Sequence, residues 1–171
     1  NTREDIGLGT DLGGYSIMIG GTNGGHLTSF SLVDVTSHGR ACGLMNPYYT
    51  VLFAPAIEPQ LRLVGEILTR YGYISDPLCR SQGRELGRMV AEGLIAFAKS
   101  LGLPTTLSEL EGFSEKHIER ALQAAKDPQL KMKLENMPIP MKPEEVDEYM
   151  GSVLKAAVSG DMEIIRTLQA G

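Results

Sequence analysis

The chain has 171 residues, of which 42% are hydrophobic and 22% charged, and this composition is typical of a globular domain large enough for one core. The formal net charge is −5 and no block of Lys and Arg occurs, which argues against nucleic-acid binding. The apolar runs are too short to span a bilayer, so we expect no membrane partner. No secretory signal opens the chain, and two cysteines are too few for a disulfide framework. We therefore expect a cytoplasmic location.

The first predicted helix covers residues 4–20. Its interior contains Gly7, Gly9, Gly13 and Gly14, each of which costs roughly 1 kcal/mol relative to Ala in a helix. Residues that cost this much are usually tolerated where two backbones must approach closely. The pattern therefore predicts a crowded helix in the core.

The glycine-rich segment 20–25 follows this helix. It lacks the Lys-Ser/Thr pair of a phosphate-binding P-loop, and no predicted strand leads into it. We interpret the segment as a turn between two helices, with a nucleotide-binding loop as the alternative.

A short helix is predicted over residues 25–33 and contains His26. Ser37 is predicted to be the N-cap of a third helix, with His38 in the first turn and Pro47 inside. This third helix has an apolar stripe at helical spacing, formed by Ala41, Leu44, Met45, Tyr48 and Leu52.

The rest of the chain also shows helical patterns. Helices are predicted over residues 59–71, 84–101, 114–125 and 143–160, with short ones after Thr106 and Asp161 and an extended linker over residues 136–140. No segment shows the alternation of a strand, so the sequence predicts an all-α, multi-helix bundle.

His26 and His38 are the candidate metal ligands. A histidine at a helix N-terminus is biased towards the neutral form, which is the form that binds metal. Cys42, one turn after His38, is either a soft ligand or a small buried thiol, and Asp11 and Asp34 are further possible ligands. The alternative is that both histidines are structural and bound to backbone carbonyls.

The third histidine, His117, lies among charged residues and is predicted to be solvated. Two histidines fall short of the three or more protein ligands of a usual catalytic metal site. We therefore expect this chain to be incomplete as a catalyst and to hold a metal poorly by itself.

Several motifs resemble those of a known family. The Gly-Gly pair before His26, the run Ser-His38-Gly-x-Ala and the position of Pro47 resemble the C-terminal half of the iron-containing (group III) alcohol dehydrogenases. Residues 102–110 resemble that family's short helix after a Gly-Leu-Pro turn, and residues 136–146 resemble its last linker and terminal helix. The likeness runs over essentially the whole chain.

The resemblance implies that residues 1–171 are a C-terminal helical metal-binding domain, truncated at its N-terminal side. A Rossmann-like domain that binds NAD(P) would precede it. In the family an Asp and three His hold Fe²⁺ or Zn²⁺, and His26 and His38 match two of these histidines. The other two ligands form an Asp-x-x-x-His motif, which this sequence lacks because Tyr15 follows Asp11 at that spacing. We therefore expect the chain to begin inside the helical domain.

The implied reaction is hydride transfer between a primary or small alcohol, or its aldehyde or ketone, and the nicotinamide, with the metal acting as a Lewis acid. Phe30 stands in the substrate pocket, where many members carry a histidine. The resemblance also implies a homo-oligomeric full-length enzyme and an inactive fragment. The alternatives are a superfamily member that acts on a phosphorylated polyol, a metal-dependent lyase, or a non-enzymatic helical interaction module. Among residues 26–49 only Arg40 is basic, which argues against a phosphorylated substrate.

Overall fold

The structure is a computed structural model that describes residues 1–22 and 24–168. Over these residues every regular element is a helix and no strand occurs, so the all-α prediction is confirmed. Within this part of the chain, no helix combines the length and the apolar character that a membrane crossing requires.

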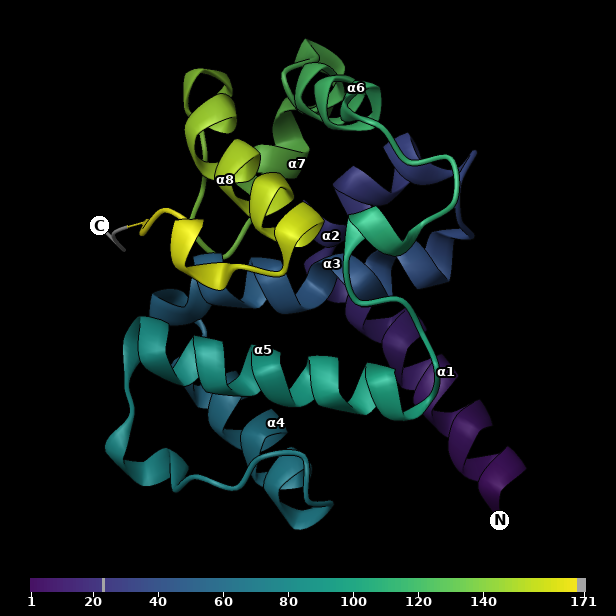
Figure 1. The fold of residues 1–171 in the computed structure, drawn as a ribbon, viewed down its shortest axis with the longest axis vertical. Helices are drawn as coiled ribbons and strands as arrows, with labels where there is room; N and C mark the ends of the chain where they lie inside the picture. The colour runs from purple at the N-terminus through teal and green to yellow at the C-terminus, as the bar shows by residue number, and fades with distance from the viewer. Residues whose placement is uncertain (23, 169–171) are drawn as a thin grey trace.

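Eight α-helices form the framework (Figure 1). They are α1 (Thr2–Gly20), α2 (Gly24–Ser29), α3 (His38–Phe53), α4 (Glu58–Arg70), α5 (Gly83–Ser100), α6 (Glu115–Ala125), α7 (Lys131–Glu135) and α8 (Val146–Ser159). Single 3₁₀ turns extend or connect them at Phe30–Leu32, Ala54–Ala56, Leu78–Arg80, Leu107–Glu109, Pro128–Leu130, Pro143–Glu145 and Met162–Ile164.

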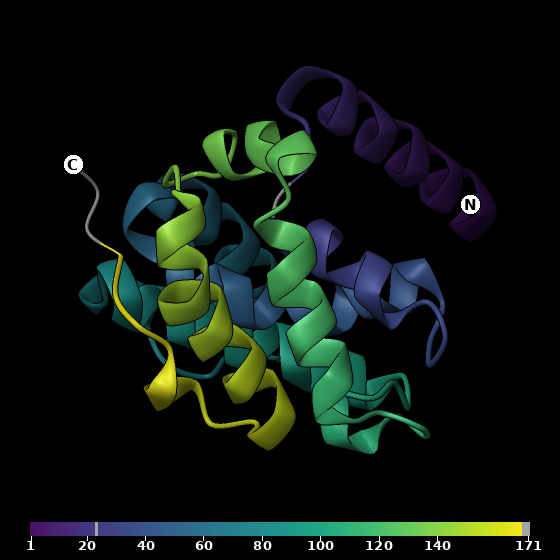
Figure 2. The ribbon, with the colours of Figure 1, turned by 90° about the horizontal axis from the view of Figure 1, so that it is seen from above.

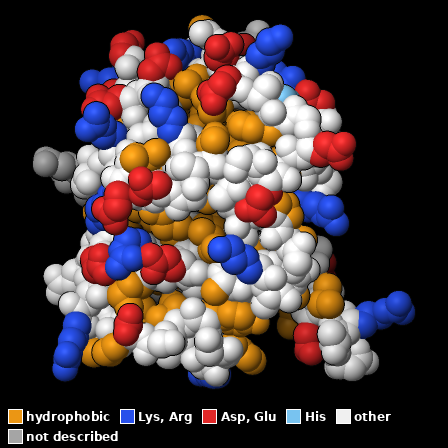
Figure 3. All heavy atoms as spheres, viewed as in Figure 1, with side chains coloured by type: hydrophobic (Ala, Val, Ile, Leu, Met, Phe, Trp, Pro, Cys, Tyr) orange, Lys and Arg blue, Asp and Glu red, His pale blue; other side chains and the backbone are white. Residues whose placement is uncertain are grey.

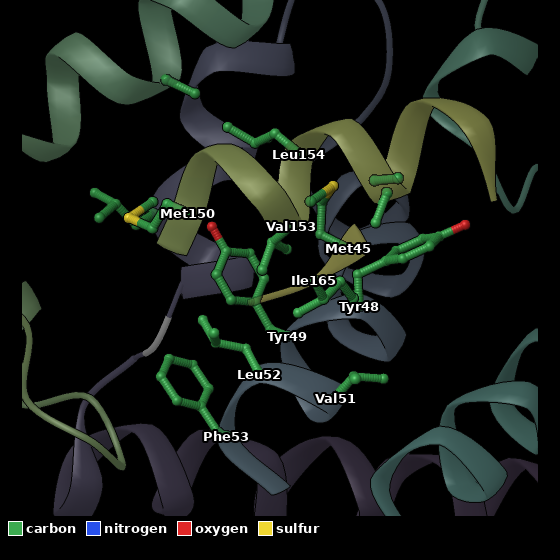
Figure 4. Packing of buried hydrophobic residues seen from close by; sticks show 14 of the residues in the cluster. Met45, Tyr48, Tyr49, Val51, Leu52, Phe53, Met150, Val153, Leu154 and Ile165 are labelled. Atoms are coloured by element: carbon green, nitrogen blue, oxygen red, sulfur yellow. The ribbon is translucent and has the colours of Figure 1, made fainter. Parts of the chain in front are cut away.

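Helix α3 is the centre of the fold, and α2, α5 and α8 all pack against it. It carries the largest buried side chains, among them Tyr48, Tyr49 and Phe53. Met150, Val153 and Leu154 of α8 meet this surface, as the close view of the core shows (Figure 4). The predicted apolar stripe of α3 is confirmed, because every member of it is buried.

Helices α4 and α5 form a second, smaller core below α3 in Figure 1. Gly87 allows α5 to approach α3, since a Cβ atom there would lie 2.3 Å from the Cβ of Ala54.

Several predicted helix starts are confirmed in detail. Thr106 and Glu109 form a capping box, and Asp161 accepts a hydrogen bond from the backbone of Glu163. Ser114 caps α6, with the His117 side chain completing a capping box. Ser37 occupies the N-cap position of α3, but its side chain makes no capping bond there.

The prediction that the first helix is crowded in the core is wrong. Helix α1 exists, but it has no buried residue, and a Cβ atom added at Gly13 or Gly14 would meet nothing within 4 Å. Figures 1 and 2 show it projecting from the rest of the molecule, and its apolar side chains lie exposed at the lower right of Figure 3. The exposed large ones are Ile6, Leu8, Leu12, Tyr15, Ile17, Met18 and Ile19.

Two further details differ from the predictions. The extended linker predicted over residues 136–140 is a bent segment that carries Met137 and Ile139 into the main core. Helix α7 was not predicted, because five residues are too few to show a helical period.

The segment 20–25 does connect two helices, with Gly21 at φ 71°, although Asn23 lies outside the described residues.

Candidate metal centre

The candidate site forms where α2 lies against the N-terminal half of α3. Gly24 makes this contact possible, since a Cβ atom there would lie 2.2 Å from the Cε1 atom of Tyr49. The hydroxyl groups of Thr28 and Tyr49 share a buried hydrogen bond of 2.8 Å across the same interface. Burial raises the pKa of Tyr49, so the phenol stays protonated and this bond persists. Together these contacts fix the position of α2 on α3.

This packing brings the imidazole rings of His26 and His38 together. Their centroids lie 4.5 Å apart, with the ring planes 85° from parallel. His26 is half-buried on α2, and His38 is exposed at the first position of α3. The structure thus places side by side the two histidines that the sequence analysis singled out.

The hydroxyl of Ser29 links the two histidines and sets the tautomer of one of them. Its Oγ atom donates to the carbonyl of His26 at 2.6 Å and lies 2.9 Å from Nδ1 of His38. Because the single hydroxyl proton goes to the carbonyl, Nδ1 of His38 must carry the proton in this second bond. The lone pair of His38 is therefore on Nε2, and a fixed tautomer of this kind is typical of metal-ligating histidines.

Cys42 supplies a third donor atom beside this lone pair. Its Sγ atom lies 3.8 Å from Nε2 of His38, and one ligand atom from each of His26, His38 and Cys42 lies within 4.8 Å of the other two. Ligands of a tetrahedral zinc ion lie roughly 3.3–3.6 Å apart, given the usual Zn–N and Zn–S bond lengths. Small side-chain adjustments would thus bring all three donors to one ion.

The accessibility of the cluster suits an ion with an open coordination position. Cys42 is half-buried, so its thiol is less enclosed than the small buried thiol of the alternative interpretation. The Phe30 ring packs against both imidazoles, with centroid distances of 5.0 Å to His26 and 5.5 Å to His38. Phe30 is itself 55% exposed, so it forms one wall of the site and leaves the site open to solvent.

The electrostatic environment keeps His26 neutral. Burial, followed by the nearby His38 and Lys133, lowers the pKa of His26 below its usual value of 6.5. Protons therefore compete less with a metal for this imidazole at neutral pH. Lys133 comes from α7, far along the chain, and its ammonium group donates a hydrogen bond of 3.0 Å to Oγ1 of Thr22.

The prediction that His117 is solvated is wrong. Its side chain is 8% exposed, and its Nε2 atom lies 3.3 Å from the carboxylate of Asp34. Its Nδ1 atom lies 3.1 Å from the backbone nitrogen and 3.0 Å from the carbonyl oxygen of Ser114, so both ring nitrogens have partners within the protein. Arg120 also binds Asp34, at 2.6 Å, and holds the pKa of that carboxyl below its usual value. His117 is a structural residue that anchors α6.

Neither of the two acids considered as ligands joins the histidine cluster. Asp34 is bound by Arg120 and His117, and Asp11 lies on the exposed α1. The residues that sequence reasoning missed are Ser29 and Lys133. Nothing in the sequence marks Ser29 as a partner of His38, and only the fold brings Lys133 to α2.

Two hollows lie away from this cluster. One of about 670 Å³ is lined by Arg84 of α5 and by residues of α8 and the C-terminal segment, among them Lys155 and Glu163. Another of about 350 Å³ lies between α3 and α5 and is mostly apolar, with Arg40 among its lining residues. None of the three donor residues lines either hollow.

Comparisons with protein-family models, with curated proteins and with solved structures found no match. The geometry of the site therefore carries the functional argument.

Proposed function

We propose that this chain is the metal-binding helical domain of an NAD(P)-dependent alcohol dehydrogenase related to the iron-containing family. His26, His38 and Cys42 hold the divalent ion, Fe²⁺ or Zn²⁺, in this proposal. The observation that supports it best is the bridge through Ser29, which places the proton of the neutral His38 ring on Nδ1 and so puts its lone pair on Nε2, beside the Cys42 thiol. A purely structural role for His38 does not explain why the Cys42 thiol lies at its Nε2 atom and the His26 ring lies beside it.

The donor set suits zinc more directly than iron. Imidazole binds both metals, whereas a thiolate is a soft ligand that favours zinc. The sequence analysis expected the chain to hold a metal poorly because it offered only two histidine ligands. With Cys42 the site has three donor atoms. Three protein donors with one open position is the usual arrangement of a catalytic zinc site.

In the proposed enzyme the metal supplies Lewis-acid polarisation of the substrate oxygen, and the nicotinamide supplies the hydride. The residues of this chain position these groups. Ser29 orients His38, and Phe30 shields one side of the imidazole pair. The resemblance places NAD(P) mainly on a preceding domain, so we expect the chain of residues 1–171 to bind metal without catalysing alcohol oxidation.

The test is metal binding followed with Co²⁺, whose visible and near-ultraviolet spectra report imidazole and thiolate ligation. We expect one ion per chain, a loss of binding of at least tenfold in His26→Ala and in His38→Ala, and the loss of the thiolate-to-metal charge-transfer band in Cys42→Ser. His117→Gln and Cys79→Ser are matched controls that remove the third histidine and the second thiol, and both should keep the ion once circular dichroism shows that they are folded. Wild-type binding in both His→Ala variants would disprove the proposed site.

A further inference from the structure

The helix α7 brings one cation to the candidate metal centre from a distant part of the chain. The Nζ atom of Lys133 bonds to Thr22, 111 residues earlier, in the connection that leads into α2. Helix α7 packs on α2, and the Lys133 side chain is half-buried there. Lys133 is therefore held against the segment that leads into the helix of His26.

Within the described part of the chain Lys133 forms no ion pair, and its hydrogen-bond partner there is the neutral hydroxyl of Thr22. Its neighbour Lys131 differs in this respect. Lys131 pairs with Glu135 of the same helix at 3.2 Å, and its side chain is 65% exposed. Asp34, which follows the 3₁₀ turn after α2, is already bound by Arg120 and His117. The positive charge of Lys133 is thus not neutralised by the fold.

A bound metal would add to the uncompensated positive charge in this region. A divalent ion with two neutral imidazoles and one thiolate keeps a net charge of +1, and Lys133 adds a second positive charge nearby. A half-buried, unbalanced charge attracts an anion, because screening is weaker there than at the open surface. Ammonium groups are common partners of carboxylate and phosphate oxygens.

We propose that Lys133 determines substrate specificity by binding an anionic group on a small alcohol or aldehyde whose reacting oxygen lies at the metal. The anionic group is a carboxylate or a phosphate, since both offer the same oxygen acceptors to an ammonium. This inference rests on the proposed metal site. Among residues 26–49 only Arg40 is basic, which argues against a phosphorylated substrate, but the fold brings Lys133 to this region and reverses that expectation.

The experiment measures ligand binding to the Co²⁺-loaded chain of residues 1–171 through changes in the visible spectrum. The probes are glycolate, glycolaldehyde phosphate and the neutral ethylene glycol. Lys133→Met keeps the apolar stem and removes the charge, and we expect it to weaken both anionic probes about tenfold while ethylene glycol binds as before. Lys133→Arg should restore most of the anion affinity, and raising the ionic strength should weaken it in the wild type.

Lys131→Gln is the matched control, because it removes a charge from the same helix at a solvent-exposed, already paired position. Unchanged anion affinity in Lys133→Met, with Co²⁺ still bound, would overturn the role of Lys133 and leave the metal site standing. A wild-type chain that binds no Co²⁺ would overturn the metal site and this inference together. The tighter of the two anionic probes identifies the group as carboxylate or phosphate.

Discussion

At the scale of single residues, the candidate site depends on the direction of one hydroxyl group. Ser29 is fully buried, and its proton is committed to the carbonyl of His26. This leaves its oxygen to accept from Nδ1 of His38, so the ring is held in the tautomer that exposes a lone pair at Nε2. One serine thus connects the backbone of one proposed ligand to the side chain of the other.

Ser29→Ala should therefore weaken metal binding without removing a ligand. Loss of the partner of a metal-ligating histidine typically costs about 10–100-fold in affinity, because the ring loses its orientation and tautomer. The measurement is the Co²⁺ dissociation constant, with folding monitored by circular dichroism. Ser152→Ala is the matched control, since Ser152 is also buried and also donates to the carbonyl three residues earlier, in α8. Equal metal affinity in the two variants would contradict the role of Ser29.

The residues of the site differ in how far the sequence could predict them. His26 and His38 were predicted as a pair from their residue types and their places on consecutive helices. Ser29 and Lys133 were not, because their roles depend on the position of α2 relative to α3 and α7. Helical spacing predicts neighbours within one helix, such as His38 and Cys42, but not partners on another.

At the scale of elements, the site is held by the contact between α2 and α3. Helix α2 has six residues, so its own backbone hydrogen bonds give it little stability. Its position comes from the packing of Gly24 on the ring of Tyr49 and from the bond between Thr28 and the phenol. The Asp34–Arg120 ion pair holds the far end of this segment against α6.

Gly24→Ala should displace α2 and lower stability, because the new Cβ atom would lie 2.2 Å from the Tyr49 ring. Overpacking of this kind costs about 1–3 kcal/mol in the free energy of unfolding, and it should weaken Co²⁺ binding as well. Gly13→Ala is the matched control, since a Cβ atom there meets nothing and alanine favours the helix by up to about 1 kcal/mol. Chemical denaturation and far-ultraviolet circular dichroism measure both effects. A Gly24→Ala protein as stable as the wild type would show that α2 is not packed this closely.

Local signals predicted the helices better than they predicted burial. The capping residues Thr106, Ser114 and Asp161 each mark a helix start that the structure contains, since capping depends on nearby backbone groups. His117 was assigned to solvent because its sequence neighbours are charged, yet it lies under Phe113 and against Asp34. Burial depends on which helices pack together, and the neighbours in the sequence do not determine that.

At the scale of the whole molecule, α1 stands apart from both the main core around α3 and the smaller core of α4 and α5 (Figures 1 and 2). Its glycines predicted a close contact with a neighbouring backbone, and within the described residues that contact is not made. Seven large apolar side chains of α1 are exposed, which is an unusual amount of apolar surface for one helix. The stability of the remaining helices therefore does not depend on α1.

Removal of residues 1–20 should leave the unfolding transition of the rest of the chain nearly unchanged, because α1 has no buried residue. Binding of a hydrophobic dye should fall, since the exposed apolar side chains are removed with the helix.

A pair of point variants tests the same idea without truncation. Leu12 is 57% exposed and Leu154 is 1% exposed, so Leu12→Ala should change the free energy of unfolding by less than about 0.5 kcal/mol, while Leu154→Ala should cost about 2–5 kcal/mol. Similar losses in the two variants, or a large loss of stability in the truncated chain, would mean that α1 packs against the core in solution.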